Sequence, residues 1–420
     1  MKVLNVCTND IKGGAARAAY RIHSGLKKIG VGSIMFVKNK ASFDSSVITC
    51  SGYGRGLLGK ISFYVDAIAY FYLMRIKNIK NPVLHSIALF SNFNKKQVER
   101  INPDIVNLHW ICAGFMKPRD LIKIKKPIVW TLHDMWAFCG AEHYVGKCER
   151  YINGYLPNNR AEGESSFDFN RWIWNKKKRA WKDLDNISII TPSNWLAECA
   201  RKSILFRNYR INVIPNGIDI EIFKPINKKT AREKLGLPLD KKFILFGAMS
   251  ATSDPRKGFE YLEKALKLID FKKKDDVEII VFGSNGSTEG MLPFPTHYLG
   301  NVNDDDLLVI IYSAADVMVI PSLEDNLPNT IMESISCGTP CVGFNLGGIP
   351  DMIDHKLNGY LAKPLDSNDL ARGIEWVLED KLRWENLSKN ARKKVEENFS
   401  IKIVAKKYED LYKNILENKK

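Results

Sequence analysis

The sequence alternates short apolar runs with helix-like runs, and this pattern occurs in both halves of the chain. In the first half, runs typical of buried strands lie at 2–8, 104–110, 127–136 and 187–193. Helical spacing of apolar residues follows the first run and closes on Gly30, a typical helix-ending residue. Because each strand-like run is followed by a helix-like one, the sequence predicts a parallel, doubly wound sheet.

The second half repeats this order. Its strand-like runs lie at 242–248, 277–284, 317–322 and 340–344. Between the halves, residues 211–238 are rich in Pro, Gly and Lys, and we interpret them as a linker. A chain of 420 residues that is 45% apolar can build two cores, so we expect two facing Rossmann-like domains, 1–215 and 216–397. In such sheets ligands bind at the carboxyl ends of the strands, which places the expected site in a cleft between the domains.

The stretch PSLEDNLPNTIMESISCGTP, residues 321–340, follows one of these strands. A helix that begins at Asn329 or Thr330 offers free backbone N–H groups and a positive dipole end, which suit a phosphate. Glu333 and Asp325 carry carboxylates that accept hydrogen bonds from the hydroxyls of sugar rings, Glu333 from a ribose and Asp325 from a second ring. Two sugars joined by a diphosphate describe a nucleotide sugar.

Charge and composition leave two questions open. Lys and Arg exceed Asp and Glu by 63 to 47, so the net charge of +16 indicates either an anionic partner or a generally lysine-rich surface. Residues 61–80 are aromatic-rich and end in basic residues, which fits either a helix on an anionic membrane surface or a buried helix. Scattered cysteines and an N-terminus without a secretory pattern predict a cytoplasmic protein, with peripheral contact at the inner membrane face as the membrane alternative.

The stretch PSLEDNLPNTIMESISCGTPCVGFNLGGIPDMI resembles the donor-site signature of the retaining glycosyltransferases of family 4. The similarity continues in NVIPNGIDIEIF, RKGFEYLEKAL, YLGNVNDDDLLVIIYSAADVMVIPS and NGYLAKPLD, and the segment HDMWAFCGAEHYVGKCERY is similar to a subgroup that builds bacterial polysaccharides. The resemblance implies the GT-B fold. In that fold the last helix, here 398–420, returns to the first domain. Its apolar stripe then becomes buried there; the stripe comprises Val404, Tyr408, Leu411, Tyr412 and Ile415.

The resemblance also assigns roles in the second domain. Asp325 occupies the place of the family's usual first glutamate and is expected to contact the transferred sugar, with Glu324 as the alternative, while Glu333 binds the ribose. Lys257 matches the family's lysine and, with Arg256, is expected to stabilise the diphosphate. Family members recognise the base largely through backbone near YLGNVN, which includes Val302. The same resemblance implies that no metal and no cofactor take part.

The first domain carries fewer signals. Gly13 and Gly14 lie where the first strand meets the first helix, and they resemble the family's glycine loop that approaches a phosphate or acceptor. His133 follows a strand and corresponds to a histidine that faces the transferred sugar, whereas we interpret His109 as an ordinary buried histidine. Cys139, His143 and Cys148 are spaced too irregularly to predict a zinc site.

The sequence therefore predicts a retaining, metal-independent glycosyltransferase. It would move a sugar from a UDP- or GDP-sugar to a hydroxyl of a glycan or lipid-linked acceptor in surface polysaccharide synthesis. The alternatives are another GT-B enzyme, such as a nucleotide-sugar epimerase, or a basic module that binds membrane or nucleic acid. The stretch FNRWIWNKKKRAWKD, 169–183, has the aromatic and basic residues that stack on bases, but it fits a packed helix equally well, and we do not expect nucleic acid.

Overall fold

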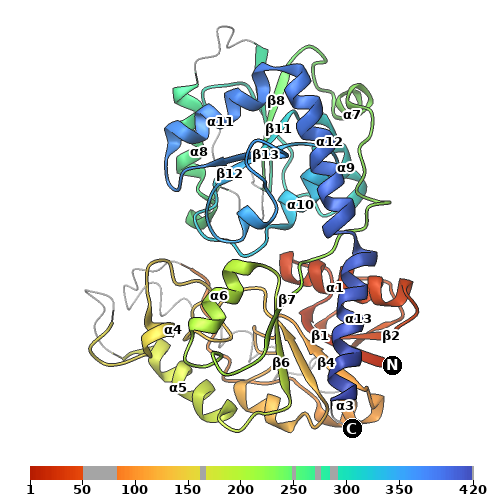
Figure 1. Cartoon of the computed structure of the whole chain (residues 1–420), viewed down its shortest axis with the longest axis vertical. Helices are drawn as coiled ribbons and strands as arrows, with labels where there is room; N and C mark the ends of the chain where they lie inside the picture. The colour runs from red at the N-terminus through yellow and green to blue at the C-terminus, as the bar shows by residue number, and fades with distance from the viewer. Residues whose placement is uncertain (51–82, 161–166, 248–251, 270–275, 284–291, 419–420) are drawn as a thin grey trace. The chain divides into compact units, whose positions relative to one another are not determined.

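The computed structural model describes residues 1–50, 83–160, 167–247, 252–269, 276–283 and 292–418. The chain divides into two compact units, residues 1–215 with 404–420 and residues 216–403 (Figure 1). Each unit is built on a parallel sheet with helices on its faces, so the expected α/β class with two doubly wound sheets is confirmed. The predicted membrane-surface or buried helix at 61–80 lies outside the described residues.

The first unit has a seven-stranded parallel sheet. In spatial order its strands are β3 (Val47–Thr49), β2 (Gly32–Asn39), β1 (Lys2–Asn9), β4 (Ile105–Leu108), β5 (Ile128–Thr131), β6 (Ile187–Thr191) and β7 (Ile211–Val213). Its helices are α1 (Gly14–Lys28), α3 (Lys95–Ile101), η1 (Pro118–Lys123), α4 (Arg150–Asn153), α5 (Phe169–Trp181), α6 (Asn194–Lys202) and α13 (Ile401–Glu417).

The second unit has a six-stranded parallel sheet. In spatial order its strands are β10 (Thr296–Tyr298), β9 (Val277–Phe282), β8 (Lys242–Gly247), β11 (Val317–Ile320), β12 (Cys341–Phe344) and β13 (Gly359–Ala362). Its helices are α7 (Lys228–Leu235), η2 (Pro255–Lys257), α8 (Phe259–Leu268), α9 (Asp305–Ala314), α10 (Asn329–Ser336), η4 (Ile349–Asp351), α11 (Ser367–Glu379) and α12 (Lys381–Asn398).

The predicted linker at 211–238 is wrong in part, because it contains the strand β7 and the helix α7. Asn227 caps α7 by accepting a hydrogen bond from the Thr230 N–H, and Gly236 ends it in the left-handed conformation. Arg232 of α7 lies buried and pairs with Asp316 at 2.7 Å, which ties the helix to the core. A tertiary ion pair thus stabilises a segment whose composition alone suggests a connection.

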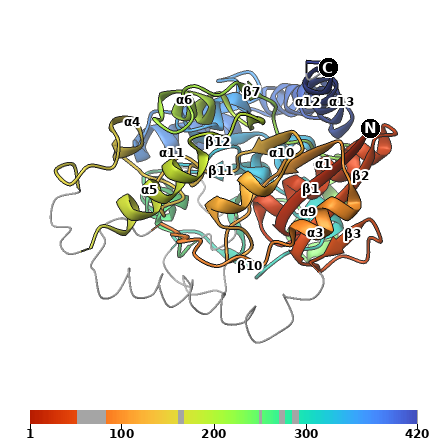
Figure 2. The same cartoon turned by 90° about the horizontal axis from the view of Figure 1, so that it is seen from below.

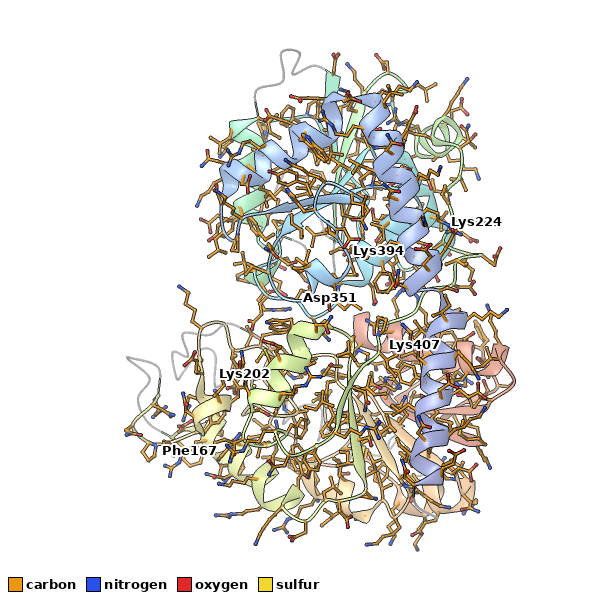
Figure 3. All side chains as sticks on the ribbon, viewed as in Figure 1. Phe167, Lys202, Lys224, Asp351, Lys394 and Lys407 are labelled. Atoms are coloured by element: carbon orange, nitrogen blue, oxygen red, sulfur yellow. The ribbon has the colours of Figure 1, made fainter. Side chains whose placement is uncertain are left out.

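The last helix, α13, packs on the first unit, as the sequence predicts. Val404, Tyr408, Leu411 and Tyr412 share an apolar cluster with Ile22 and Leu26 of α1 and with the strand residues Val3, Ile105 and Val129. Figures 1 and 2 both place α13 beside α1. Lys407, labelled in Figure 3, is exposed on the same helix, so only one face of α13 is buried.

The tryptophan-rich helix α5 is packed rather than presented to solvent as a stacking surface. Trp174 and Trp181 are buried in the first unit's core, and Trp172 packs against the cluster around Ile173. Lys177 is also fully buried on this helix, and its ammonium group donates to the carbonyl oxygens of Cys139 and Gly140 at 3.1 and 2.7 Å. These contacts favour the packed-helix interpretation over nucleic-acid binding.

Candidate functional site

Three loops of the second unit follow β8, β11 and β12, which are neighbours in the sheet. Because the strands are parallel, their carboxyl ends lie at one edge, and the loops after them lie close together. The described part of the first loop contains η2, and the second loop begins at Pro321. The third begins at Asn345. The predicted donor-site residues Arg256, Lys257 and Asp325 lie in the first two of these loops.

The first and second loops are joined through their backbones. The Leu323 N–H donates to the Arg256 carbonyl at 2.8 Å, and the Arg256 guanidinium donates to the Glu324 carbonyl at 3.3 Å. Gly258 has a φ of +69°, and a Cβ added there would lie 1.9 Å from the Pro321 carbonyl oxygen. Glycine at this position therefore permits the close approach of the two loops.

Lys257 and Asp325 form an ion pair across these loops, with 2.6 Å between Nζ and Oδ2. The backbone of Asp325 is held from the other side, because its carbonyl accepts the Gly348 N–H at 3.0 Å. A Cβ on Gly347 would lie 2.3 Å from the same carbonyl oxygen. Asp325, which we predicted to contact the transferred sugar, is thus held at its carboxylate by Lys257 and at its backbone carbonyl by the turn at Gly347 and Gly348.

Arg256 is paired within its own loop as well. Its second guanidinium nitrogen lies 2.7 Å from an oxygen of Asp254, and the backbone N–H of Arg256 also donates to that carboxylate. With the bond to Glu324, this pair holds the guanidinium beside the Asp325 loop. The arginine and the lysine of the predicted diphosphate site therefore lie together.

Glu333 lies in α10, and only 3% of its surface is exposed. Its Oε2 accepts a hydrogen bond from the Tyr312 hydroxyl of α9 at 2.9 Å, which orients the carboxylate. Asn329 and Thr330 form the first turn of α10 and are partly exposed. Pro328 precedes them as the N-cap and supplies no side-chain cap, so the first N–H groups of the helix receive no bond from it.

Val302 follows β10 and is partly buried against the core cluster that also contains Tyr312 and Met332. The backbone before it is tied to β9, because Leu299 N–H donates to the Val281 carbonyl at 2.8 Å. The segment predicted to recognise the base is therefore joined to the same core that carries Glu333.

In the first unit, Gly13 and Gly14 join β1 to α1. Gly13 is the N-cap of α1, with a φ of 94°, and its carbonyl accepts the Arg17 N–H at 2.9 Å. Asp10, just before them, accepts backbone N–H groups from Ile11, Ala41 and Ser42. Burial alone would raise the pKa of Asp10, but these hydrogen bonds, led by that of Ser42, hold it below its ordinary value.

His133 lies two residues beyond β5, and its Nε2 is 3.1 Å from Nδ1 of His109, which directly follows β4. The two rings are stacked, with 5.4 Å between their centroids. Burial lowers the pKa of His133 to about 4, against the opposing effect of Asp134. Burial, followed by the neighbouring His133, also lowers the pKa of His109, so both rings are neutral at pH 7.

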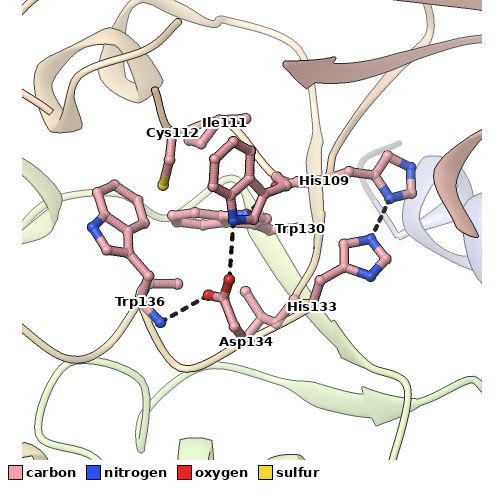
Figure 4. A pocket seen from close by; sticks show the side chains of 10 residues that line it. His109, Ile111, Cys112, Trp130, His133, Asp134 and Trp136 are labelled. Carbon is pink, nitrogen blue, oxygen red and sulfur yellow. Dashed lines mark hydrogen bonds between the residues drawn. The ribbon is translucent and has the colours of Figure 1, made fainter. Parts of the chain in front are cut away.

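Asp134, next to His133, anchors a second group of side chains, of which the sequence analysis considered only His143. Its Oδ2 accepts the Trp110 indole N–H at 3.0 Å, and its Oδ1 accepts the Trp136 backbone N–H (Figure 4). The same Oδ2 lies 2.7 Å from Nδ1 of His143. Asp134, Trp110 and Trp136 line a small pocket with His109 and His133 at the carboxyl ends of β4 and β5, whereas His143 is not part of this lining. A carboxylate directly after a strand-end histidine was the available signal.

The comparisons with known proteins match both halves of the chain. A model described as Glycosyltransferase Family 4 matches residues 12–222, and one described as Glycosyl transferases group 1 matches residues 227–394. An uncharacterised glycosyltransferase of Methanocaldococcus jannaschii is 30% identical over 88% of this chain and 94% of its own length. The chain belongs to glycosyltransferase family 4.

Other relatives of this family 4 glycosyltransferase match over shorter lengths. The Escherichia coli UDP-Gal:alpha-D-GlcNAc-diphosphoundecaprenol alpha-1,3-galactosyltransferase is 31% identical over 53% of this chain and 59% of its own length. Among solved structures, sucrose-phosphate synthase of Thermosynechococcus elongatus matches with a TM-score of 0.71 at 18% identity, with all of both chains covered. HepE of Anabaena, in complex with UDP and glucose, matches with a TM-score of 0.62 at 17% identity over 99% of this chain and all of its own. These likenesses confirm the GT-B fold.

The structure gives His143 another role than that of a metal ligand. Both of its ring nitrogens are engaged, Nδ1 with Asp134 and Nε2 with the Ser86 hydroxyl at 2.9 Å. Within the described ranges, no three His, Cys, Asp or Glu side chains gather closely enough to hold a metal ion. In the same part of this family 4 glycosyltransferase, no helix has the length and apolar character needed to span a bilayer.

Proposed function

We propose that this glycosyltransferase retains the anomeric configuration, uses no metal, and takes its sugar from a nucleotide diphosphate donor. The observation that carries the proposal is the Lys257–Asp325 ion pair at 2.6 Å at the loop that leads into α10, the helix that carries the buried carboxylate of Glu333. An enzyme that releases a diphosphate without a metal needs fixed cations and helix N–H groups to stabilise the departing charge. Lys257, Arg256 and the first turn of α10 supply both.

Each residue then has a defined task. Glu333 accepts hydrogen bonds from the ribose hydroxyls, and Tyr312 keeps its carboxylate in place. Asp325 and His133 contact the transferred sugar, and Gly13 with Gly14 lets the backbone approach the acceptor or a phosphate. The family resemblance implies that the leaving diphosphate takes the proton of the incoming hydroxyl on the same face of the sugar.

We infer that the donor is a UDP-sugar and the acceptor a lipid-linked or free glycan of surface polysaccharide synthesis. HepE was solved with UDP and glucose, and the named substrates of the E. coli relative are UDP-Gal and a diphosphoundecaprenol-linked sugar. The surplus of basic residues, +16 overall, also suits an acceptor that carries a diphosphate at an anionic membrane surface. A GDP-sugar is the competing donor class.

A thermal-shift panel of UDP-, GDP- and ADP-sugars tests the donor class, because a ligand that binds the native state raises its stability. We expect UDP-sugars to raise Tm, with the effect unchanged by EDTA. The anomeric configuration of the product, read by NMR coupling constants, tests retention. Incubation with donor alone addresses the epimerase alternative, since an epimerase converts the donor without any acceptor. No Tm shift with any nucleotide sugar would contradict the proposal.

A further inference from the structure

A row of buried polar side chains crosses the sheet of the first unit. Asn5 of β1, Asn107 of β4 and Thr131 of β5 are all fully buried, on neighbouring strands. Asn5 and Asn107 are register partners, and the row lies on the sheet face that α13 covers. A buried polar group is costly unless it is hydrogen-bonded, so the partners of these side chains define what the row does.

The row leads directly to His133. The Asn107 amide nitrogen lies 3.1 Å from Asn5 Oδ1 and 3.1 Å from His109 Nε2. His109 Nδ1 in turn lies 3.1 Å from His133 Nε2, and Figure 4 shows this contact between the two rings. Four side chains from three strand regions thus form one continuous chain of hydrogen bonds.

The donors in this chain fix where the imidazole protons sit. The Asn107 amide has two hydrogens, one for Asn5 Oδ1 and one for His109 Nε2. His109 Nε2 is therefore an acceptor, and the proton of the neutral ring is on Nδ1, from which it is donated to His133 Nε2. Asn5 Oδ1 also lies 3.3 Å from His109 Nε2, but a proton on that nitrogen would oppose the Asn107 N–H.

The orientation of Asn107 is set from the helix α13. Thr131 Oγ1 donates to Asn107 Oδ1 at 3.0 Å, and it lies 3.2 Å from the Tyr408 hydroxyl. The Thr131 hydroxyl has one hydrogen, which it gives to Asn107, so it accepts a hydrogen bond from Tyr408. The Asn107 oxygen then faces Thr131, and the Asn107 nitrogen faces His109. At the other end, the Asn5 amide donates to Ser33 Oγ at 2.9 Å, so both amides are held.

We propose that His109 and Asn107 are positioning residues that hold neutral His133 with its proton on Nδ1, and that Tyr408 fixes this arrangement through Thr131. The inference rests on the proposed function only for the role of His133 at the transferred sugar. With that tautomer, His133 offers an N–H donor to a sugar oxygen. The helix α13 thereby determines the chemical form of a side chain at the carboxyl edge of the sheet, besides covering the core.

Long-range ¹H–¹⁵N NMR of the full-length protein tests the tautomer, because it distinguishes the protonated from the unprotonated ring nitrogen. The His133 signals are assigned with His133→Gln. We expect Nδ1–H for His133 in the wild type and in His109→Asn, which keeps an N–H donor close to the position of Nδ1. His109→Leu removes the donor, and we expect His133 to change to Nε2–H. Nε2–H in the wild type, or the same tautomer in His109→Leu, would overturn the proposal.

Tyr408→Phe provides a milder variant if His109→Leu does not fold. It removes the hydroxyl beside Thr131 and is expected to give His133 a mixture of both tautomers. Tyr209→Phe is the matched control, because it also removes a tyrosine hydroxyl of the first unit, one that donates to the Trp181 carbonyl at 3.0 Å and not to a residue of the row. A His133 signal that is identical in both variants and in the wild type would show that α13 does not set the tautomer.

Sugar transfer gives an independent measurement. Losing one hydrogen bond that orients His133 is expected to lower kcat/KM by about 5- to 10-fold in His109→Leu. His109→Asn should recover most of this loss, because it keeps the N–H donor to His133. If His109 only filled space in the core, the donor would make no such difference. If neither the wild type nor any variant transfers sugar, the proposed function fails. The NMR measurement still decides the tautomer of His133 in that case.

Discussion

The ammonium nitrogen of Lys257 lies 2.6 Å from a carboxylate oxygen of Asp325, although 68 residues separate the two in the chain. Their side chains are only 19% and 12% exposed, so each charge depends on the other for compensation. The pair joins the loops after two neighbouring strands, β8 and β11. It therefore has a structural effect that can be separated from its proposed effect on the diphosphate.

Removing either charge of this pair should destabilise the second unit. We expect Asp325→Asn or Lys257→Met to lower the free energy of unfolding by about 1–3 kcal/mol, because the remaining charge loses its partner in a partly buried place. The double variant should be less destabilised than the sum of the two single variants. Urea unfolding of all four proteins measures the coupling, and strictly additive losses would contradict it.

The same lysine has a catalytic signature. If Lys257 acts mainly on the charge that develops as the diphosphate leaves, Lys257→Ala should lower kcat more than it weakens donor binding. Steady-state kinetics beside calorimetric donor affinity makes the comparison. A variant with normal kcat and only a raised KM would mean that Lys257 binds the ground state and the transition state alike.

Glu333→Gln should weaken donor binding by about 10- to 150-fold, since a charge-assisted acceptor of ribose hydroxyls becomes a neutral amide. Tyr312→Phe should have a smaller effect, because it removes the bond that orients the carboxylate but keeps the charge. Glu379→Gln, on the exposed face of α11, is the matched control. Unchanged donor affinity of Glu333→Gln in calorimetry would remove the ribose role.

Two glycines with nearly the same backbone conformation separate a conformational cost from a steric one. Gly236 and Gly258 have φ values of +66° and +69°, but an added Cβ meets nothing within 4 Å at Gly236. Gly236→Ala should therefore cost about 1–2 kcal/mol of stability, the penalty of the left-handed conformation. Gly258→Ala should cost more and should weaken donor binding, because it forces the Pro321 loop away. Equal losses by urea unfolding would show that the loops yield freely.

Stability should fall in acid because of His23. Its ring is buried between Ser33 and Ser46, and burial lowers its pKa from 6.5 to about 4. The unfolded chain then binds more protons than the folded chain between these values, so stability is full above pH 6.5 and is lost as pH falls toward 4. This contribution amounts to about 3 kcal/mol at most. In urea unfolding from pH 7 to 4.5, His23→Gln should lose less stability than the wild type; parallel curves would refute the assignment.

Parts of this architecture follow from local sequence. The apolar runs at 2–8, 242–248 and 317–322 could be recognised as buried strands, because a strand covered on both faces is apolar at nearly every position. The helix that begins at Asn329 and the apolar stripe on α13 could also be recognised, because helical periodicity is visible within a few turns of sequence. The short strands β7, β10 and β13 escaped, because three or four residues carry too little periodicity.

The sequence by itself therefore determined the two parallel sheets, several of their strands, and the residue types that follow these strands, among them Lys257, Asp325, Glu333 and His133. Only the tertiary structure decided which of them meet. Lys257 reaches Asp325 because β8 and β11 are neighbours in the sheet, and His109 reaches His133 because β4 and β5 are. Strand order is set by how whole helices and strands pack, whereas capping and periodicity act over a few residues, so these contacts have no local signal in the chain.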